Sequence, residues 1–390
     1  MTATSTHVKP QVMPSSGGEV LLLIGTSKGL FTATSTEGRS EWTVEGPTFS
    51  MQGVYGLGVT PAAGDGPPGR IYAGVDSSHF GPSLSYSDDL GTTWHEPVGS
   101  EHGPIAFPAG TTDGDKPASV ERVWQIVASP TEPGVVWAGT QPSALFKSTD
   151  GGDSFTLVRG LWDHPHRPLW EAGFGGQAIH SILPHPDDPR RLLVAMSTGG
   201  VYRTEDGGET WSASNTGIKA YFIPGDQYPE FGQCVHKINR AAGRPETVYA
   251  QNHHGVYRSD DEGRVWTSIA DGLPADFGFP IVGHPHRAAT VYTYPLVADG
   301  ERFPPSATMR VYRSDDAGRT WRAFAGGLAP APSYSVVLRD AMCTDQNDVA
   351  GVYLGTKDGS VYASNDDGES FGVIAEHLPS VLNVKAVSLG

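Results

Sequence analysis

Residues 201–211 read VYRTEDGGETW, and close copies of this stretch recur along the whole chain. Each copy closes on an aromatic residue, and these residues are Trp42, Trp94, Phe155, Trp211, Trp266, Trp321 and Phe371. The differences between successive positions run from 50 to 61 residues. A unit that recurs at this spacing predicts a repeat architecture, either a solenoid or a β-propeller.

Each copy predicts a strand, a tight turn and a second strand. Apolar and aromatic residues precede the turn, as at Val256 and Tyr257, which is typical of a half-buried strand. The turn sequence is Ser-x-Asp-x-Gly, in which Asp accepts backbone N–H bonds and Gly tolerates a positive φ. An aromatic residue then anchors the next strand. The unit is therefore a hairpin held together by its aspartate.

The pattern Ser-x-Asp-x-Gly-x-x-Trp at 259–266 and its siblings resembles the Asp-box, or BNR repeat. This motif is found in sialidase-like β-propellers, sortilin-type receptors, xyloglucanases and photosystem assembly factors. The fourth copy carries Thr204 in place of Ser, and the first carries Thr36 where Asp is expected. The resemblance covers nearly the whole chain. It implies a propeller in which the boxes are structural and lie on the face opposite the ligand.

We expect an all-β fold: a seven-bladed β-propeller of four-stranded antiparallel blades, formed by one domain over residues 19–390. The 390 residues suit seven such blades. Residues 20–28 look like a second strand without a first, and residues 382–389 like a first strand without a second. Pairing these two ends would complete the last blade and leave no exposed sheet edge. Residues 1–18 are polar, and we expect a flexible N-terminal segment there.

The net charge and the distribution of apolar residues indicate which kinds of partner the protein is expected to lack. The net charge of −16 repels phosphate backbones, so we expect no nucleic-acid partner. No apolar run approaches the roughly 18 residues that span a bilayer, and the N-terminus lacks the apolar core of a secretory signal. We therefore expect no membrane partner, a cytoplasmic location, and a monomer or weak homo-oligomer. Cys234 and Cys343 fall two blades apart, so a disulfide is not expected.

Aligning the first strands of the blades points to a functional funnel. The equivalent positions are Tyr55, Trp124, His180, His236, Pro280, Arg339 and Asn383, followed in four blades by Gln125, Ser181, Lys237 and Asp340. Purely structural strands would carry aliphatic residues here. The longest connections, at 96–121, 160–177, 215–233 and 297–309, also lie on this face. We predict a polar funnel that binds a small molecule or a carbohydrate; the alternative is a hydrated channel without a ligand.

Roles within the funnel follow from residue type. Tyr55 and Trp124 would stack on a ring, or else belong to the core. Arg339 would bind a carboxylate, or else pair with Asp340. The ligand-binding candidates are Tyr55, Trp124, Gln125 and Asn383. The catalytic candidates are His180, His236, Arg339, Asp340, Lys237 and Glu121.

Histidines predict a metal site. His180 and His236 hold matching positions in neighbouring blades, and His253 ends the second strand of the blade that contains His236. Their imidazoles would converge on one divalent ion, with zinc, manganese, iron and calcium all open; Glu121 or Glu230 would complete the set. The alternative is a set of hydrogen-bonded channel histidines. No nucleotide cofactor is expected.

Three functions remain open, and the histidine funnel favours the first of them, a metal-assisted lyase, hydrolase or oxygenase. The second is a non-catalytic binding or assembly propeller. The third is a glycoside hydrolase with paired carboxylates drawn from Glu121, Glu171, Glu230 and Asp340. Resemblance to sialidases implies three arginines and a Phe/Tyr-Arg-Ile-Pro motif. The ring supplies only Arg339, and YFIP at 221–224 lacks the arginine, so sialidase activity is not expected.

Overall fold

The computed structural model describes residues 18–60, 69–97, 103–173, 175–221, 227–298 and 300–389. The expected N-terminal segment, apart from Gly18, and most of the YFIP stretch lie outside these ranges. The fold is the predicted seven-bladed β-propeller of four-stranded antiparallel sheets, and it is nearly all β. No helix in the described part of the chain has the length and apolar character to cross a membrane.

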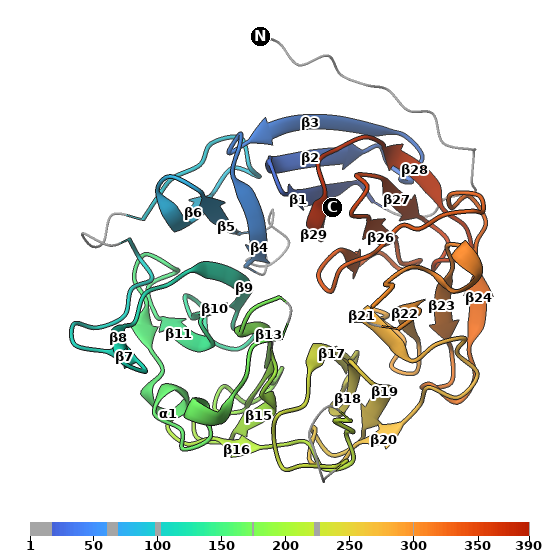
Figure 1. Ribbon diagram of the computed structural model, residues 1–390. Coiled ribbons are helices and arrows are strands. Elements are labelled where there is room, and N and C mark those ends of the chain that lie inside the picture. Colours follow the sequence, from blue (N-terminus) through green and yellow to red (C-terminus); the bar gives the residue numbers. More distant parts are fainter. Residues whose placement is uncertain are drawn as a thin grey trace. The chain divides into compact units, whose positions relative to one another are not determined.

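In the described part of the chain, six of the seven blades are four-stranded sheets, and the blade β4-β5-β6 has three strands. Figure 1 shows the arrangement of these strands. In the three-stranded blade the fourth strand is reduced to a bridge between Tyr86 and His95. The strands, in hydrogen-bonded order within each sheet, are β29 (Val381–Ser388), β1 (Val20–Thr26), β2 (Gly29–Ser35) and β3 (Trp42–Thr48); β4 (Gly53–Val59), β5 (Ile71–Ser77) and β6 (Gly81–Ser87); β9 (Arg122–Ala128), β10 (Val136–Gln141), β11 (Ala144–Ser148) and β12 (Thr156–Leu157); β13 (Ala178–Pro184), β14 (Leu192–Ser197), β15 (Gly200–Thr204) and β16 (Ser212–Ala213); β17 (Val235–Ala241), β18 (Arg244–Asn252), β19 (Val256–Ser259) and β20 (Thr267–Ser268); β21 (Phe277–Gly283), β22 (Val291–Leu296), β23 (Val311–Ser314) and β24 (Arg322–Phe324); β25 (Met342–Thr344), β26 (Val352–Gly355), β27 (Val361–Ser364) and β28 (Gly372–Ala375).

The described chain divides into two compact units. The first comprises Met1–Val54, Asn239–Ser259 and Thr267–Gly390, and the second Tyr55–Ile238 and Asp260–Trp266. The divisions fall inside β4 and β17, so these strands contribute residues to both units.

In the first unit, the two ends of the chain pair as predicted. β1 lies between β2 and β29 (Figure 1), and its register with β29 runs from Val20 opposite Ser388 to Gly25 opposite Asn383. The side chains of β1 are all buried, which explains its continuous apolar sequence.

A buried ion pair lies in this unit. Arg39 Nη1 is 2.7 Å from Asp345 Oδ2, and both side chains are almost fully buried. Asp345 also accepts hydrogen bonds from the Tyr353 hydroxyl and from the backbone N–H groups of Asn347 and Gly351. The buried carboxylate is thus compensated by one cation and three further donors, as a charge in a protein interior must be.

In the second unit, the insertions between blades carry structure of their own. The short strands β7 (Thr112–Asp113) and β8 (Lys116–Pro117) form a hairpin, and the segment after β12 contains α1 (Arg159–Trp162) and a 3-10 turn, η1 (Arg167–Leu169). Arg167 Nη1 donates to Asp113 Oδ1 over 3.1 Å and joins the two insertions. In the first unit, the insertion after β22 contains the 3-10 turn η2 (Pro305–Ala307).

The repeated Ser-x-Asp-x-Gly turns share one hydrogen-bond pattern. In the turn that begins at Thr204, the hydroxyl donates to Asp206 over 2.7 Å and accepts from the Gly208 N–H over 3.0 Å. Asp206 in turn accepts from the backbone N–H and the hydroxyl of Thr210. The same bonds recur in the turns that begin at Ser87, Ser148, Ser314 and Ser364.

A recurrent glycine in the second strand sets the contact with the first strand of the following blade. A Cβ on Gly139 would lie 2.4 Å from the carbonyl oxygen of Ile179, and one on Gly74 would lie 3.0 Å from that of Val123. In the first unit, Gly25 meets the Val54 carbonyl oxygen in the same way, at 2.6 Å. Glycine is needed at these positions because a backbone approaches closely.

Candidate functional site

The first strands of the second unit carry a β-bulge at the position that the sequence alignment singles out. On β9, Gln125 pairs with Gly139 and Val123 with Thr140, so Trp124 is the extra residue. On β13 the extra residue is His180, because Ile179 pairs with Met196 and Ser181 with Ala195. A bulge redirects a side chain locally and is common next to functional sites.

In the first unit the corresponding bulges enclose Phe279 and Pro280 on β21, and Leu382 on β29. Asn383, the residue predicted from the sequence, is the neighbour of that last bulge and is buried. The sequence alignment therefore found the bulge position to within one residue in these two blades.

Tyr55 and Trp124 form an aromatic pair in the second unit. Their ring centroids lie 5.2 Å apart in an edge-to-face arrangement, and both side chains are half-buried. The Arg122 guanidinium lies over the Tyr55 ring, 4.1 Å from its centroid. Edge-to-face packing and the cation–π contact hold the two rings in place. They therefore form a fixed, partly exposed aromatic surface.

Two carboxylates lie beside this surface. Arg122 Nε and Nη2 donate to Asp76 Oδ2 over 3.0 and 2.9 Å. Gln141 connects the other carboxylate: its Nε2 donates to Glu121 over 2.8 Å, and its Oε1 accepts from Trp124 Nε1 over 3.2 Å. Arg122 and Asp76 are each about a quarter exposed, and Glu121 is exposed. We call Tyr55, Asp76, Glu121, Arg122, Trp124 and Gln141 the aromatic–carboxylate cluster.

Lys237 contacts Gln125, the residue that follows Trp124 on β9. The Lys237 Nζ is 3.4 Å from Gln125 Oε1. Lys237 lies on β17, and the blade that begins with β13 comes between β9 and β17 in the sequence. The first strands of these blades therefore bring two polar side chains that were singled out in the sequence, Gln125 and Lys237, into contact within the second unit.

His180 is fully buried and hydrogen-bonded. Its Nε2 is 3.1 Å from Ser197 Oγ, and its Nδ1 is 3.3 Å from Ser181 Oγ. Ser197 donates its own proton to the Val235 carbonyl oxygen over 3.0 Å, so it accepts from His180. The structure thus places His180 among hydroxyl groups, unlike the ligand set of His180, His236 and His253 predicted from the sequence. The bulge and this hydrogen bonding explain the difference.

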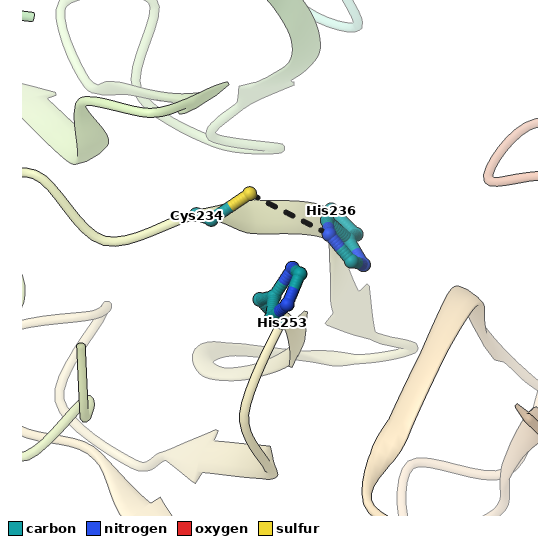
Figure 2. Close-up of side chains that lie close together, drawn as sticks. All are labelled: Cys234, His236 and His253. Carbon is teal, nitrogen blue, oxygen red and sulfur yellow. Dashed lines mark hydrogen bonds between the residues drawn. The ribbon is translucent and has the colours of Figure 1, made fainter. Parts of the chain in front are cut away.

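His236 and His253 do come together, and Cys234 joins them (Figure 2). Cys234 Sγ is 3.6 Å from His236 Nε2, and one donor atom from each of the three residues lies within 4.8 Å of the others. Cys234 and His236 are buried, and His253 is half-buried. Neither Cys234 nor Cys343 forms a disulfide in the described chain.

The second cysteine, Cys343, lies on β25 in the first unit, and burial raises the pKa of its thiol to about 12.

Arg339, Asp340 and Asn383 lie in the first unit. The expected first strand at 338–345 is shorter than predicted, because β25 begins only at Met342. Arg339 therefore lies in a turn, and Asp340 forms a bridge with Asn383, in which its carbonyl accepts from the Val384 N–H over 2.8 Å. Asp340 and Asn383 are both buried.

Two carboxylates proposed from the sequence, Glu171 and Glu230, are exposed and lie outside the aromatic–carboxylate cluster. Glu171 exchanges backbone hydrogen bonds with Thr198. Glu230 uses its carbonyl to accept from Asn215 Nδ2 over 3.0 Å. Neither contact uses the carboxylate.

Sequence reasoning missed Asp76, Arg122, Gln141 and Cys234. Asp76 and Gln141 could have been found from an alignment of the second strands, because each follows the glycine of its strand by two residues. His253, which the sequence did predict, holds the same position relative to Gln251. Cys234 was visible as a Cys-x-His pair at the start of a strand. The alignment of first strands supplied Tyr55 and Trp124 of the aromatic–carboxylate cluster, and His236 of the group formed with Cys234 and His253.

Among known proteins, the chain is similar to part of several xyloglucanases, although no family model matches it. The chain is 23% identical over 240 residues to an oligoxyloglucan-reducing end-specific xyloglucanase of Emericella nidulans, which covers 54% of this chain and 28% of that protein. It is 25% identical over 274 residues to a xyloglucanase of a Paenibacillus species, and this match covers 60% of this chain and 25% of that protein. The chain thus matches about a quarter of the length of these relatives.

Solved structures show the same fold. An ancestral GH74 enzyme superposes with a TM-score of 0.54 at 18% identity, over 82% of this chain and 38% of that one. YCF48, solved with a bound peptide, gives a TM-score of 0.51 at 13% identity, over 86% of this chain and 93% of that one. At these identities the likeness concerns the fold alone.

Proposed function

We propose that this propeller binds a carbohydrate of the xyloglucan class and hydrolyses a glycosidic bond at the aromatic–carboxylate cluster. The observation that carries the proposal is the placement of Asp76 and Glu121 beside the Tyr55–Trp124 pair. The match to xyloglucanases supports it. The repeated turns then act as Asp-boxes, which stabilise the blades that carry the site.

The aromatic pair suits a sugar ring. Pyranose rings have apolar faces, and a fixed aromatic surface binds them at low entropic cost. Tyr55 and Trp124 are already held by their mutual contact, by Arg122 and by Gln141. The surrounding groups, Gln125 and Lys237, supply donors and an acceptor for hydroxyl groups.

The carboxylates suit glycosidic chemistry. A general acid protonates the leaving oxygen, and a second carboxylate activates water or attacks the sugar. We assign Glu121 as the acid, because it is exposed and is oriented by Gln141. We assign Asp76 as the second carboxylate, because two donors of Arg122 hold its oxygen in one orientation.

The metal-assisted lyase, which the histidines favour at the level of sequence, gains no support from the comparisons. The paired-carboxylate hydrolase fits the xyloglucanase relatives better. The proposed carboxylates of the hydrolase differ from those expected from the sequence. Asp76 replaces Asp340, because Asp340 is buried and forms a backbone bridge with Asn383.

Hydrolysis of xyloglucan oligosaccharides by the purified protein tests this proposal. Glu121→Gln removes the acid while keeping the side-chain shape, and we expect the rate to fall by about 100-fold or more. The matched control is Glu171→Gln, which alters an exposed carboxylate of the same unit and should leave the rate unchanged. Trp124→Ala should weaken oligosaccharide binding by about tenfold or more.

Two outcomes would contradict the assignment. Equal loss of activity in Glu171→Gln and Glu121→Gln would show that the cluster is not the reacting centre. Binding of oligosaccharide without any hydrolysis by the wild-type protein would reduce the function to a non-catalytic carbohydrate-binding propeller.

A further inference from the structure

We propose that Cys234, His236 and His253 bind one divalent transition-metal ion, with Zn²⁺ as the best match. This site is separate from the aromatic–carboxylate cluster and does not depend on the proposed hydrolase activity. Its three donors are one sulfur and two imidazole nitrogens, a set that binds zinc in many proteins.

One sheet supplies all three residues. Cys234 immediately precedes β17 and His236 lies on it, so the period of two places both side chains on the same face. His253 immediately follows β18, the neighbour of β17 in the sheet β17-β18-β19-β20. Because the two strands are antiparallel and joined by a short turn, the start of β17 lies beside the end of β18. In Figure 2 the His253 ring points toward the other two side chains.

The spacing of the donors fits a tetrahedral ion. Zn–S and Zn–N bonds of about 2.3 and 2.0–2.1 Å, at the tetrahedral angle, separate sulfur from nitrogen by about 3.6 Å. Cys234 Sγ and His236 Nε2 are 3.6 Å apart. The third donor lies within 4.8 Å of both, so a small rotation of the half-buried His253 ring completes the set.

The backbone around the two buried donors is anchored. Ser197 Oγ donates to the carbonyl oxygen of Val235, the residue between Cys234 and His236, and His180 in turn contacts Ser197. On the other side, Gln233 Nε2 donates to the carbonyl oxygens of Pro229 and Ile218. Such surrounding hydrogen bonds orient the direct ligands of a metal. His180, predicted as a ligand, thus acts as a positioning residue in this proposal.

The chemistry of the donors selects the metal. A thiolate and two imidazoles suit Zn²⁺ or copper, whereas Ca²⁺ and Mn²⁺ prefer oxygen ligands. Three protein ligands leave a fourth position for water or for an oxygen of a bound molecule. Binding converts the Cys234 thiol to a thiolate, and the released proton passes to the buffer.

Metal titration of the full chain under reducing conditions tests the proposal. We expect one equivalent of zinc by elemental analysis, and a thiolate-to-metal charge-transfer band when Co²⁺ replaces it. Cys234→Ser should abolish the band, and His236→Ala or His253→Ala should lower zinc affinity by about 100-fold. His254→Ala and Cys343→Ser are the matched controls and should retain both zinc and the band.

A second readout covers the case in which a ligand variant fails to fold. Zinc should raise the Tm of the wild-type protein and protect Cys234 from alkylation in the Cys343→Ser background. The proposal is overturned if the folded wild-type protein binds no zinc or copper, or if Co²⁺ binds without the charge-transfer band. It is also overturned if His254→Ala and His253→Ala lose zinc equally. Loss of this site leaves the hydrolase proposal intact, because its residues are different.

Discussion

The aspartates of the repeated turns show how one side chain stabilises a hairpin. The side chain of Thr210, and to a smaller extent its backbone N–H, donate hydrogen bonds to Asp206 and lower the pKa of its carboxyl group to about 2. Thr93 lowers the pKa of Asp89 to about 2 in the same way. Both residues are exposed. Their low pKa values therefore come from fixed donors and not from burial.

The pH dependence of stability follows from that shift. A carboxyl group whose pKa is lower in the folded state stabilises the protein fully above its ordinary pKa near 3.8 and loses this effect as pH falls toward 2. We expect Asp206→Asn to lower the Tm at neutral pH, and the difference from wild type to shrink between pH 4 and pH 2. Glu209→Gln, in the same turn, should show no such convergence. A gap that stays constant down to pH 2 would contradict this role.

Single residues also mark the limit of prediction from sequence. Tyr55, Trp124, Gln125 and Lys237 were found because they occupy aligned positions on first strands, and the structure brings them into two contacting pairs. Asp76 was missed because it lies on a second strand, and its partner Arg122 lies two residues before the bulged Trp124. Contacts between different strands depend on register, which the repeat pattern does not contain.

At the scale of elements, the second-strand glycines explain why blades can pack closely. Gly74 and Gly139 each allow the carbonyl of a neighbouring first strand to approach. Ala195 and Gln251 occupy the equivalent positions in two other blades, so this position is not a glycine throughout the chain. The number of strands and their order were predictable from the repeats. The bulges at Trp124 and His180 were not, because they arise from pairing with the adjacent strand.

Gly139→Ala tests this packing. The added Cβ would lie 2.4 Å from the Ile179 carbonyl oxygen, which is backbone and has to move. We expect a loss of about 1–3 kcal/mol in the free energy of unfolding, measured by urea denaturation. Gly300→Ala is the control, since its Cβ would meet nothing within 4 Å. Equal stabilities of the two variants would show that the close approach does not limit blade packing.

At the scale of the whole molecule, the chain encodes a seven-bladed β-propeller through repetition. The pairing of β1 with β29 joins residues more than 350 positions apart, and it followed from two unmatched strand patterns at the chain ends. Function is not encoded in the repeats in the same way, because the repeated turns share one hydrogen-bond pattern whereas the candidate sites use residues that differ between blades. The hydrolase proposal therefore depends on the aromatic–carboxylate cluster together with the xyloglucanase relatives.

A crystal structure of the Glu121→Gln protein soaked with a xyloglucan oligosaccharide tests the central proposal most directly. We expect a sugar ring against Tyr55 and Trp124, with a glycosidic oxygen within hydrogen-bond distance of residue 121 and Asp76 near the anomeric carbon. An oligosaccharide bound elsewhere, or no oligosaccharide at saturating concentration, would contradict the assignment.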